Sequence, residues 1–175
     1  MALSLFSDTH WNLVTRLTRL LRGALLFPWS YIDGHVEIWD KKNKKIWKWT
    51  WIRKWVVIQD GILKVWKNTN IWPYSTIFPW KKIVIWNNVL IWPHVWIYWW
   101  SYDFKSKESI IKQQWTSSRW IIIEDDVWIG SHSVITDWVT IKKGSVVWAW
   151  SIVTKDTQPY SISVWSPAKN IWYRK

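Results

Sequence analysis

The residues best suited to chemistry lie in one interruption of an otherwise regular sequence. Between Trp99 and Trp120 no aliphatic periodicity is present, and this stretch carries Tyr102 and Asp103. A carboxylate can accept a proton from a hydroxyl, whereas a phenol with a pKa near 10 stays protonated at pH 7. Long loops in compact domains are usually functional, so the segment 99–120 is where we first expect a site.

The four histidines lie outside this segment. An imidazole with a pKa near 6.5 suits proton transfer, but His94 and His132 fall in repeat turns. His10 and His35 lie far upstream, and no three histidines share a spacing that would bring them onto one zinc ion. We therefore predict turn positions for His94 and His132, and no metal site.

Positive charge is a second chemical feature, because the formal net charge is +12. Such a charge favours an anionic partner, for which nucleic acid, an acidic membrane surface and a phosphate-rich cofactor are candidates. The basic residues are spread through the chain rather than gathered in a recognition motif, so we expect no nucleic-acid partner. Four lysines lie toward the C-terminal end, where they could contact phosphates or be solvated surface residues: Lys142, Lys143, Lys155 and Lys169.

Composition limits the class of protein. The 175 residues, with 49% hydrophobic and 21% charged residues, fit one folded domain. No cysteine is present, so neither a disulfide framework nor a thiolate metal site is expected. No signal-peptide pattern is evident, and no apolar run approaches the roughly 20 residues that a membrane span needs. We expect a cytoplasmic protein.

A six-residue aliphatic period dominates the chain. Its clearest run is Ile123, Ile129, Ile135, Ile141, Val147 and Val153. An earlier run is Ile46, Ile52 and Ile58, followed after a slip by Val65, Ile71 and Ile77, and then by Ile85, Ile91 and Ile97. One short strand and one turn per repeat let stacked coils bury each aliphatic row as a continuous ladder. The period therefore predicts an all-β solenoid, a parallel β-helix of hexapeptide repeats with one protruding loop.

The first 28 residues follow a different pattern. Leucines share one face of a predicted short helix within 8–22, and Arg16, Arg19 and Arg22 share another. This basic amphipathic helix could cap the first coil, and it could also dock on a membrane surface. We thus predict an N-terminal helical cap over 1–28, and a β-helix domain over 29–175 that includes the loop 99–120 and a C-terminal tail over 157–175.

Several stretches resemble a known family. They are Ile123 to Ser131 (IEDDVWIGS), Val146 to Asp156 ending in SIVTKD, Pro159 to Ile162 (PYSI) and Pro167 to Lys169 (PAK). In this order, after a run of hexads, they resemble the hexapeptide-repeat acetyltransferases, which include galactoside, maltose and polysaccharide O-acetyltransferases. The resemblance implies a left-handed β-helix, a homotrimer, and acetyl transfer from acetyl-CoA to a sugar hydroxyl, in lipopolysaccharide or capsule assembly. Work at the inner face of the membrane would agree with the basic helix.

The resemblance also assigns roles to individual residues. Tyr102 holds the position of the family's catalytic histidine, and Asp103 beside it is the nearest alternative proton acceptor. Positions that contact coenzyme A in relatives are Ser131, Ala149, Thr154, Lys155 and Lys169. Because a phenol is a poor base at pH 7, two interpretations stay open: an acetyltransferase with altered chemistry, or a catalytically inactive β-helix that serves as a scaffold or binding subunit.

Tryptophan is abundant where the family has glycine. The chain has 23 Trp and 5 Gly. Positions at which the family has glycine but this chain has tryptophan include Trp39, Trp47, Trp72, Trp86, Trp92, Trp138, Trp148, Trp150 and Trp165, whereas Trp128 matches the family. We hypothesise that UGA codons for glycine were read as tryptophan; UGG codons at Trp47, Trp86 and Trp148 would contradict this. The alternative is a real aromatic surface that binds carbohydrate or ice.

Overall fold

The computed structural model describes residues 29–98, 102, 105–113 and 120–175. The predicted N-terminal helix and Asp103 lie outside these residues. Within the part described, none of the helices is both long enough and apolar enough to cross a bilayer.

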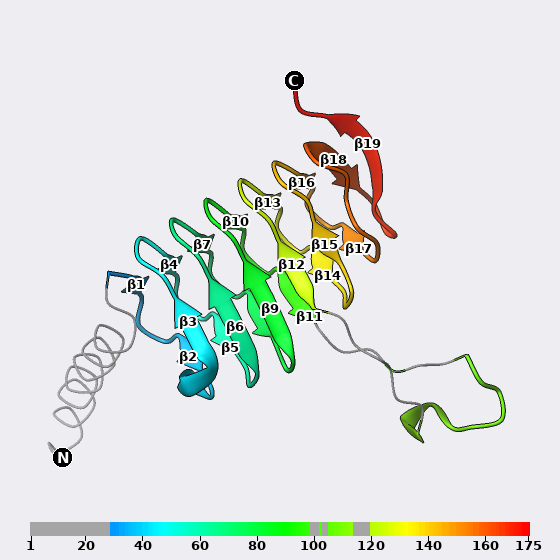
Figure 1. Ribbon diagram of the computed structural model, residues 1–175, viewed down its shortest axis with the longest axis horizontal. Helices are drawn as coiled ribbons and strands as arrows, with labels where there is room; N and C mark the ends of the chain where they lie inside the picture. Colours follow the sequence, from blue (N-terminus) through cyan, green and yellow to red (C-terminus); the bar gives the residue numbers. More distant parts are fainter. Residues whose placement is uncertain (1–28, 99–101, 103–104, 114–119) are drawn as a thin grey trace, which may run out of the picture.

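The described chain winds into a left-handed solenoid with three parallel sheets, as the six-residue period predicts (Figure 1). Sheet A contains β1 (Tyr31–Ile32), β4 (Trp51–Ile52), β7 (Asn70–Ile71), β10 (Leu90–Ile91), β13 (Trp128–Ile129), β16 (Val146–Val147), β18 (Ser161–Val164) and β19 (Lys169–Tyr173). Sheet B contains β2 (Glu37–Ile38), β5 (Val57–Ile58), β8 (Thr76–Phe78), β11 (Trp96–Tyr98), β14 (Val134–Ile135) and β17 (Ile152–Val153). Sheet C contains β3 (Lys44–Ile46), β6 (Ile62–Val65), β9 (Lys82–Ile85), β12 (Ile121–Ile123) and β15 (Thr140–Ile141). Two short 3-10 helices, η1 (Lys41–Asn43) and η2 (Ile111–Gln113), complete the elements.

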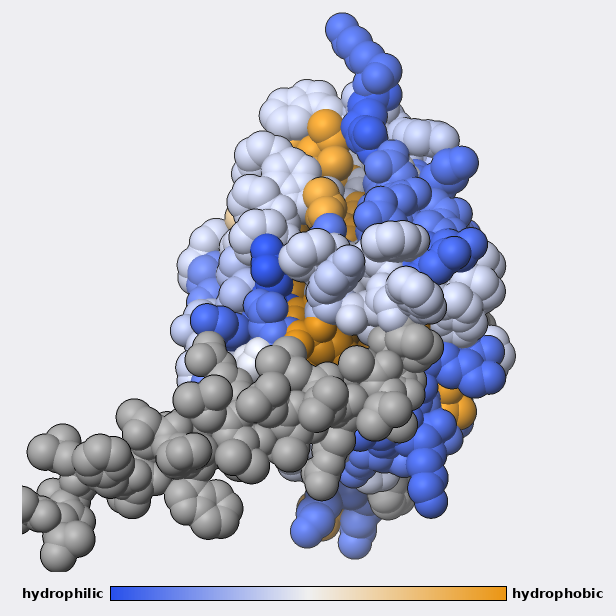
Figure 2. All heavy atoms as spheres, turned by 90° about the vertical axis from the view of Figure 1, so that its left-hand side faces the viewer, coloured by the Kyte–Doolittle hydropathy of each residue, from blue (hydrophilic) through white to orange (hydrophobic). Residues whose placement is uncertain are grey.

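The aliphatic ladders form the core. Every member of the predicted rows is buried, from Ile46 in the first coil to Val153 in the last. Parallel pairing keeps each row in line: Ile91 lies between Ile71 and Ile129 in sheet A, for example. Because strands in a sheet are about 4.8 Å apart, each side chain contacts its equivalents in the coils on both sides. Figure 2 shows one face of the exterior, where a narrow hydrophobic stripe runs along the solenoid between less apolar side chains.

The corners between sheets A and B, and between C and A, require a left-handed backbone. In the A–B corner the column His35, Trp55, Tyr74, His94, His132 and Trp150 has φ between 59° and 64°. In the C–A corner the column Trp29, Trp49, Asn68, Asn88, Asp126, Gly144 and Tyr160 has φ between 56° and 70°. Asn, Asp, His and Gly are the residues that tolerate this conformation best, so the columns explain where these types occur.

The B–C corner absorbs the irregularities of the repeat. Relative to the six-residue spacing, the chain has one extra residue between Ile58 and Val65 and two extra residues between Ile77 and Ile85. The long insertion lies at the same corner, between Ile97 and Ile121. The other two corners keep the six-residue spacing throughout the runs named above. Residues 105–113, including η2, project away from the solenoid (Figure 1).

Polar contacts close both ends of the described solenoid. In the first coil, Lys44 Nζ donates to the carbonyl oxygens of Asp40 (3.4 Å) and Gly61 (2.6 Å), and burial lowers the lysine pKa. At the other end β19 folds back antiparallel on β18. There Arg174 donates to the Asp126 carboxylate at 2.9 Å and to the Gly144 carbonyl at 2.9 Å. These contacts stabilise the terminal coils, whose outer edges have no further parallel strand.

Tryptophan and glycine share columns in the structure. Gly130 directly follows β13 of sheet A, in the same register as Trp72, Trp92 and Trp148. A Cβ at Gly130 would lie 2.5 Å from the Ala149 nitrogen, so that position suits glycine. Gly144 likewise shares the C–A column of positive φ with Trp49. Most described tryptophans are exposed, including Trp49 and Trp148. This pattern agrees with the hypothesis that glycine is the encoded residue.

We predict that Trp49→Gly stabilises the protein by about 1 kcal/mol. Trp49 has a φ of 65° and is about half exposed, so removing the indole loses little burial while glycine removes a penalty of about 1–2 kcal/mol. Chemical denaturation measures the change. Trp49→Ala is the matched control, because alanine removes the same side chain but keeps the backbone penalty. An equal gain from both variants would contradict the explanation.

Candidate functional site

Sheet B brings the predicted site residues into three successive coils. Strand β11 pairs with β14 through Ile97 and Ile135, and β14 pairs with β17 through Ile135 and Val153. The insertion that carries Tyr102 begins directly after β11. Each predicted cofactor residue except Lys169 precedes or follows β14 or β17 at a sheet corner. The C-terminal half of sheet B therefore frames the candidate site.

Two predicted cofactor positions lie at the A–B corner in adjacent coils. Ser131 precedes β14 and Ala149 precedes β17, and both are half-buried. The Trp150 amide donates to the Ser131 carbonyl at 3.0 Å, so the two turns are in direct contact. The small side chains here leave the backbone of both turns close to the surface. Such a surface can present peptide groups to an elongated ligand, as the resemblance implies.

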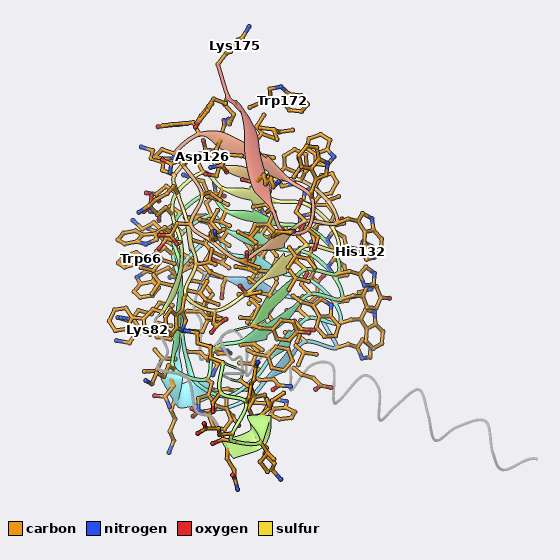
Figure 3. All side chains as sticks on the ribbon, turned by 90° about the vertical axis from the view of Figure 1, so that its right-hand side faces the viewer. Trp66, Lys82, Asp126, His132, Trp172 and Lys175 are labelled. Atoms are coloured by element: carbon orange, nitrogen blue, oxygen red, sulfur yellow. The ribbon has the colours of Figure 1, made fainter. Side chains whose placement is uncertain are left out.

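The A–B corner also carries a continuous stack of rings. His94 stacks on Tyr74 at 5.0 Å and on His132 at 4.7 Å, and His132 stacks on Trp150 at 4.3 Å. The rings point outward along one edge of the solenoid, opposite the edge that carries Trp66 and Lys82 (Figure 3). His94 and His132 are therefore turn residues, as predicted from their place in the repeat.

Two predicted cofactor positions lie directly after β17, and a third lies in the hairpin that follows it. Thr154 and Lys155 follow this strand at the B–C corner, and both are exposed. The Ala168 amide donates to the carbonyl of Ile152, the first residue of β17, at 2.8 Å, and the following residue, Lys169, pairs with Val164 in the β18–β19 hairpin of sheet A. The hairpin that carries Lys169 thus contacts the start of β17, whereas Thr154 and Lys155 follow the end of this strand.

The four C-terminal lysines divide into two groups. Lys142 forms an ion pair with Glu124 at 3.2 Å, and the Lys143 amide donates to the same carboxylate at 2.8 Å. Both follow β15 at the C–A corner, away from β17. Among the described residues, Lys155 and Lys169 form no ion pair. These two ammonium groups are therefore the better placed for anionic groups of a ligand.

The predicted catalytic residues are only partly described. Tyr102 is an exposed residue of the insertion. Asp103 lies outside the described residues. Their roles stay predictions.

The sequence analysis missed Asp137. This residue follows β14 at the B–C corner, one coil after the insertion, and is half-buried. Burial raises the pKa of its carboxyl above the ordinary value of 3.8, and a hydrogen bond from its own backbone amide opposes that change. One coil earlier at the same corner, burial also raises the pKa of Tyr98, which stacks on Phe78 at 5.0 Å. An acidic residue in the turn beside the insertion was the available signal.

The described residues contain no group of three His, Cys, Asp or Glu side chains placed to hold a metal ion.

Comparison with known proteins agrees with the repeat. Residues 121–155 match the bacterial transferase hexapeptide family (six repeats). The chain is 44% identical over 69 residues to a Schizosaccharomyces pombe protein named as an acetyltransferase, covering 39% of this chain and 31% of that protein. It is 44% identical over 50 residues to a chloramphenicol acetyltransferase of Agrobacterium fabrum, covering 29% of this chain and 24% of the relative. The chain thus spans less than a third of the length of these curated relatives.

Solved structures share the fold. AntD, an N-acyltransferase from Bacillus cereus, superposes with a TM-score of 0.77 at 21% identity, covering 85% of this chain and 82% of AntD. The hexapeptide-repeat acetyltransferase VCA0836 from Vibrio cholerae gives 0.59 at 24% identity, with 91% and 81% covered. The polySia-specific acetyltransferase NeuO gives 0.57 at 19% identity, with 85% and 89% covered. The predicted resemblance and the left-handed β-helix are confirmed.

We predict that Asp137→Asn stabilises the folded protein at pH 7. Because the folded-state pKa of Asp137 is raised, its contribution to stability is full below about pH 3.8 and is lost as pH rises through the raised pKa. The gap between variant and wild type, measured by denaturation across pH, should therefore close as the solution is acidified below that range. Asp156→Asn, one coil away, controls for the change in net charge. A gap that is independent of pH would contradict the prediction.

Proposed function

We propose that this hexapeptide-repeat protein is an acetyl-CoA-dependent O-acetyltransferase that acts on a sugar hydroxyl. The proposal rests on the position of two lysines relative to the coils that match the family. The coils that match the bacterial transferase hexapeptide family, over 121–155, end at Lys155, and the β18–β19 hairpin that bonds to the start of β17 carries Lys169. Neither cation forms an ion pair among the described residues. A polyanionic thioester substrate fits this end of the solenoid.

The residues present suit coenzyme A. Its phosphates would interact with Lys155 and Lys169, which are exposed, and its amide-containing arm would lie against the turns of Ser131 and Ala149. The relatives agree with this choice, since AntD has been solved with 3-hydroxybutyryl-CoA and with coenzyme A. Acetyl-CoA supplies an activated thioester; the protein binds it, orients the acceptor and removes the acceptor's proton.

A sugar is the proposed acceptor. NeuO is described as specific for polysialic acid, and AntD has been solved with a dideoxy amino sugar linked to dTDP. Together with the motifs that resemble polysaccharide O-acetyltransferases, these relatives favour a carbohydrate hydroxyl in lipopolysaccharide or capsule assembly. We further propose a cytoplasmic homotrimer, with the predicted N-terminal helix available for contact with a membrane surface.

A second candidate function rests on Tyr102. The exposed phenol holds the position where the resembled family has its catalytic histidine, and a phenol is a poor base at pH 7. A β-helix that binds coenzyme A or a carbohydrate without acyl transfer would be compatible with this residue. This scaffold interpretation predicts binding without turnover.

We predict that replacing Lys155 and Lys169 together by alanine raises the Kd for coenzyme A at least tenfold. Losing charge-assisted hydrogen bonds worth about 1.5–3 kcal/mol each accounts for such a change. Isothermal titration calorimetry at fixed salt measures it. The matched control is Lys45→Ala with Lys64→Ala, which removes the same charge from strands of sheet C far from β17. Equal weakening by the control pair would mean that only net charge matters.

We predict that the wild-type chain transfers acetyl groups from acetyl-CoA to at least one member of a panel of sugars and oligosaccharides. Release of the free thiol, measured with a thiol reagent, and the mass of the acetylated sugar report the reaction. Tyr102→His is assayed in parallel, because imidazole can accept a proton near neutral pH. If neither chain transfers acetyl groups while both bind coenzyme A, the scaffold function is favoured instead.

A further inference from the structure

The insertion leaves and rejoins the solenoid beside one particular turn. Tyr98 is the last residue of β11 before the insertion, and β12 begins at Ile121 after it. Strand β11 pairs with β14, and β12 pairs with β15. The turn between β14 and β15, residues 136–139, therefore lies directly beside both ends of the insertion. This turn contains Asp137.

Asp137 is the one carboxylate of this turn. It is half-buried, and its one hydrogen-bond partner among the described residues is its own backbone amide. It forms no ion pair with any described residue. The titratable groups at the same corner in neighbouring coils are Tyr98 on one side and Lys155 and Asp156 on the other. Burial brings the carboxyl pKa closer to neutrality, which improves a base for proton transfer at pH 7.

Other described groups are less suited to this task. Tyr102 offers a phenol, which as a class is a weak proton acceptor at neutral pH. His94 and His132 lie at the A–B corner, on the opposite side of sheet B from Asp137. Strand β14 lies between His132 and Asp137 in the chain, a separation of roughly 15 Å for extended backbone. The Asp156 carboxylate accepts a hydrogen bond from the Thr140 amide at 2.7 Å, so it has a structural partner.

We propose that Asp137 is the catalytic proton acceptor of this protein. The inference rests on the proposed acyl transfer. The Asp137 carboxylate takes the proton of the acceptor hydroxyl as the hydroxyl oxygen attacks the thioester carbonyl carbon. The C–S bond then breaks, the acetyl ester forms, and the departing thiolate takes up that proton to give the free thiol of coenzyme A. Asp137 thereby supplies the base that Tyr102 cannot.

Asp137→Asn tests the assignment. Asparagine keeps the size of the side chain and an oxygen acceptor for the backbone amide, but it cannot take the proton. We expect kcat to fall at least a hundredfold with KM and the Kd for coenzyme A changed less than twofold. The wild-type kcat should rise with pH through the titration of the Asp137 carboxyl, followed independently by ¹³C NMR of the labelled side chain, and the residual rate of the variant should lose this dependence.

The matched control is Asp156→Asn, which removes a carboxylate at the same corner one coil away and keeps an oxygen to accept from the Thr140 amide. It should retain the wild-type rate. The role of Asp137 is overturned if Asp137→Asn keeps the wild-type kcat, or if Asp137→Asn and Asp156→Asn lose activity equally. Either result leaves the acetyltransferase proposal intact. A wild-type chain that binds coenzyme A but transfers to no acceptor overturns both proposals together.

Discussion

The stacking of one coil on the next is the interaction on which the rest of this structure depends. Each strand of two to five residues is too short to be stable alone, and its backbone groups are paired only by the coils on either side. Parallel pairing fixes the register, and the register places isoleucine on isoleucine along the axis, as in Ile71, Ile91 and Ile129. Burial of these ladders and hydrogen bonding between coils therefore stabilise the same geometry.

Closing each coil strains the backbone at the corners. The chain changes direction through residues with positive φ, and the columns formed by these residues are as regular as the aliphatic ladders. Asn68 and Asn88 fit such positions and also bond to each other at 2.8 Å, so the corner gains a ladder of its own. Bulky residues such as Trp49 occupy the same column without that benefit. Backbone strain therefore applies to the tryptophans of positive φ, such as Trp49, Trp138 and Trp165.

The proposed site lies where the repeat is least regular. The A–B and C–A corners keep six-residue spacing, whereas the B–C corner admits extra residues and the long insertion. A solenoid tolerates such a departure because the coils before and after the insertion still pair through sheets A and B. The turn with Asp137 connects β14 and β15, which pair with the strands on either side of the insertion. A carboxylate on a regular coil beside a long insertion is a suitable arrangement for acting on one particular acceptor.

The sequence was enough to predict the solenoid, the interruption at 99–120 and the turn positions of His94 and His132. All three follow from a six-residue period in aliphatic side chains, which is a local property of the chain. It also indicated Lys155 and Lys169 through motifs. Only the tertiary structure separated these two lysines from Lys142, which pairs with Glu124, because the corner that a lysine occupies depends on how the coils close. For Asp137 the sequence offered only an acidic residue in a turn. Its burial and its place beside the insertion arise from pairing between residues far apart in sequence, which no short motif contains.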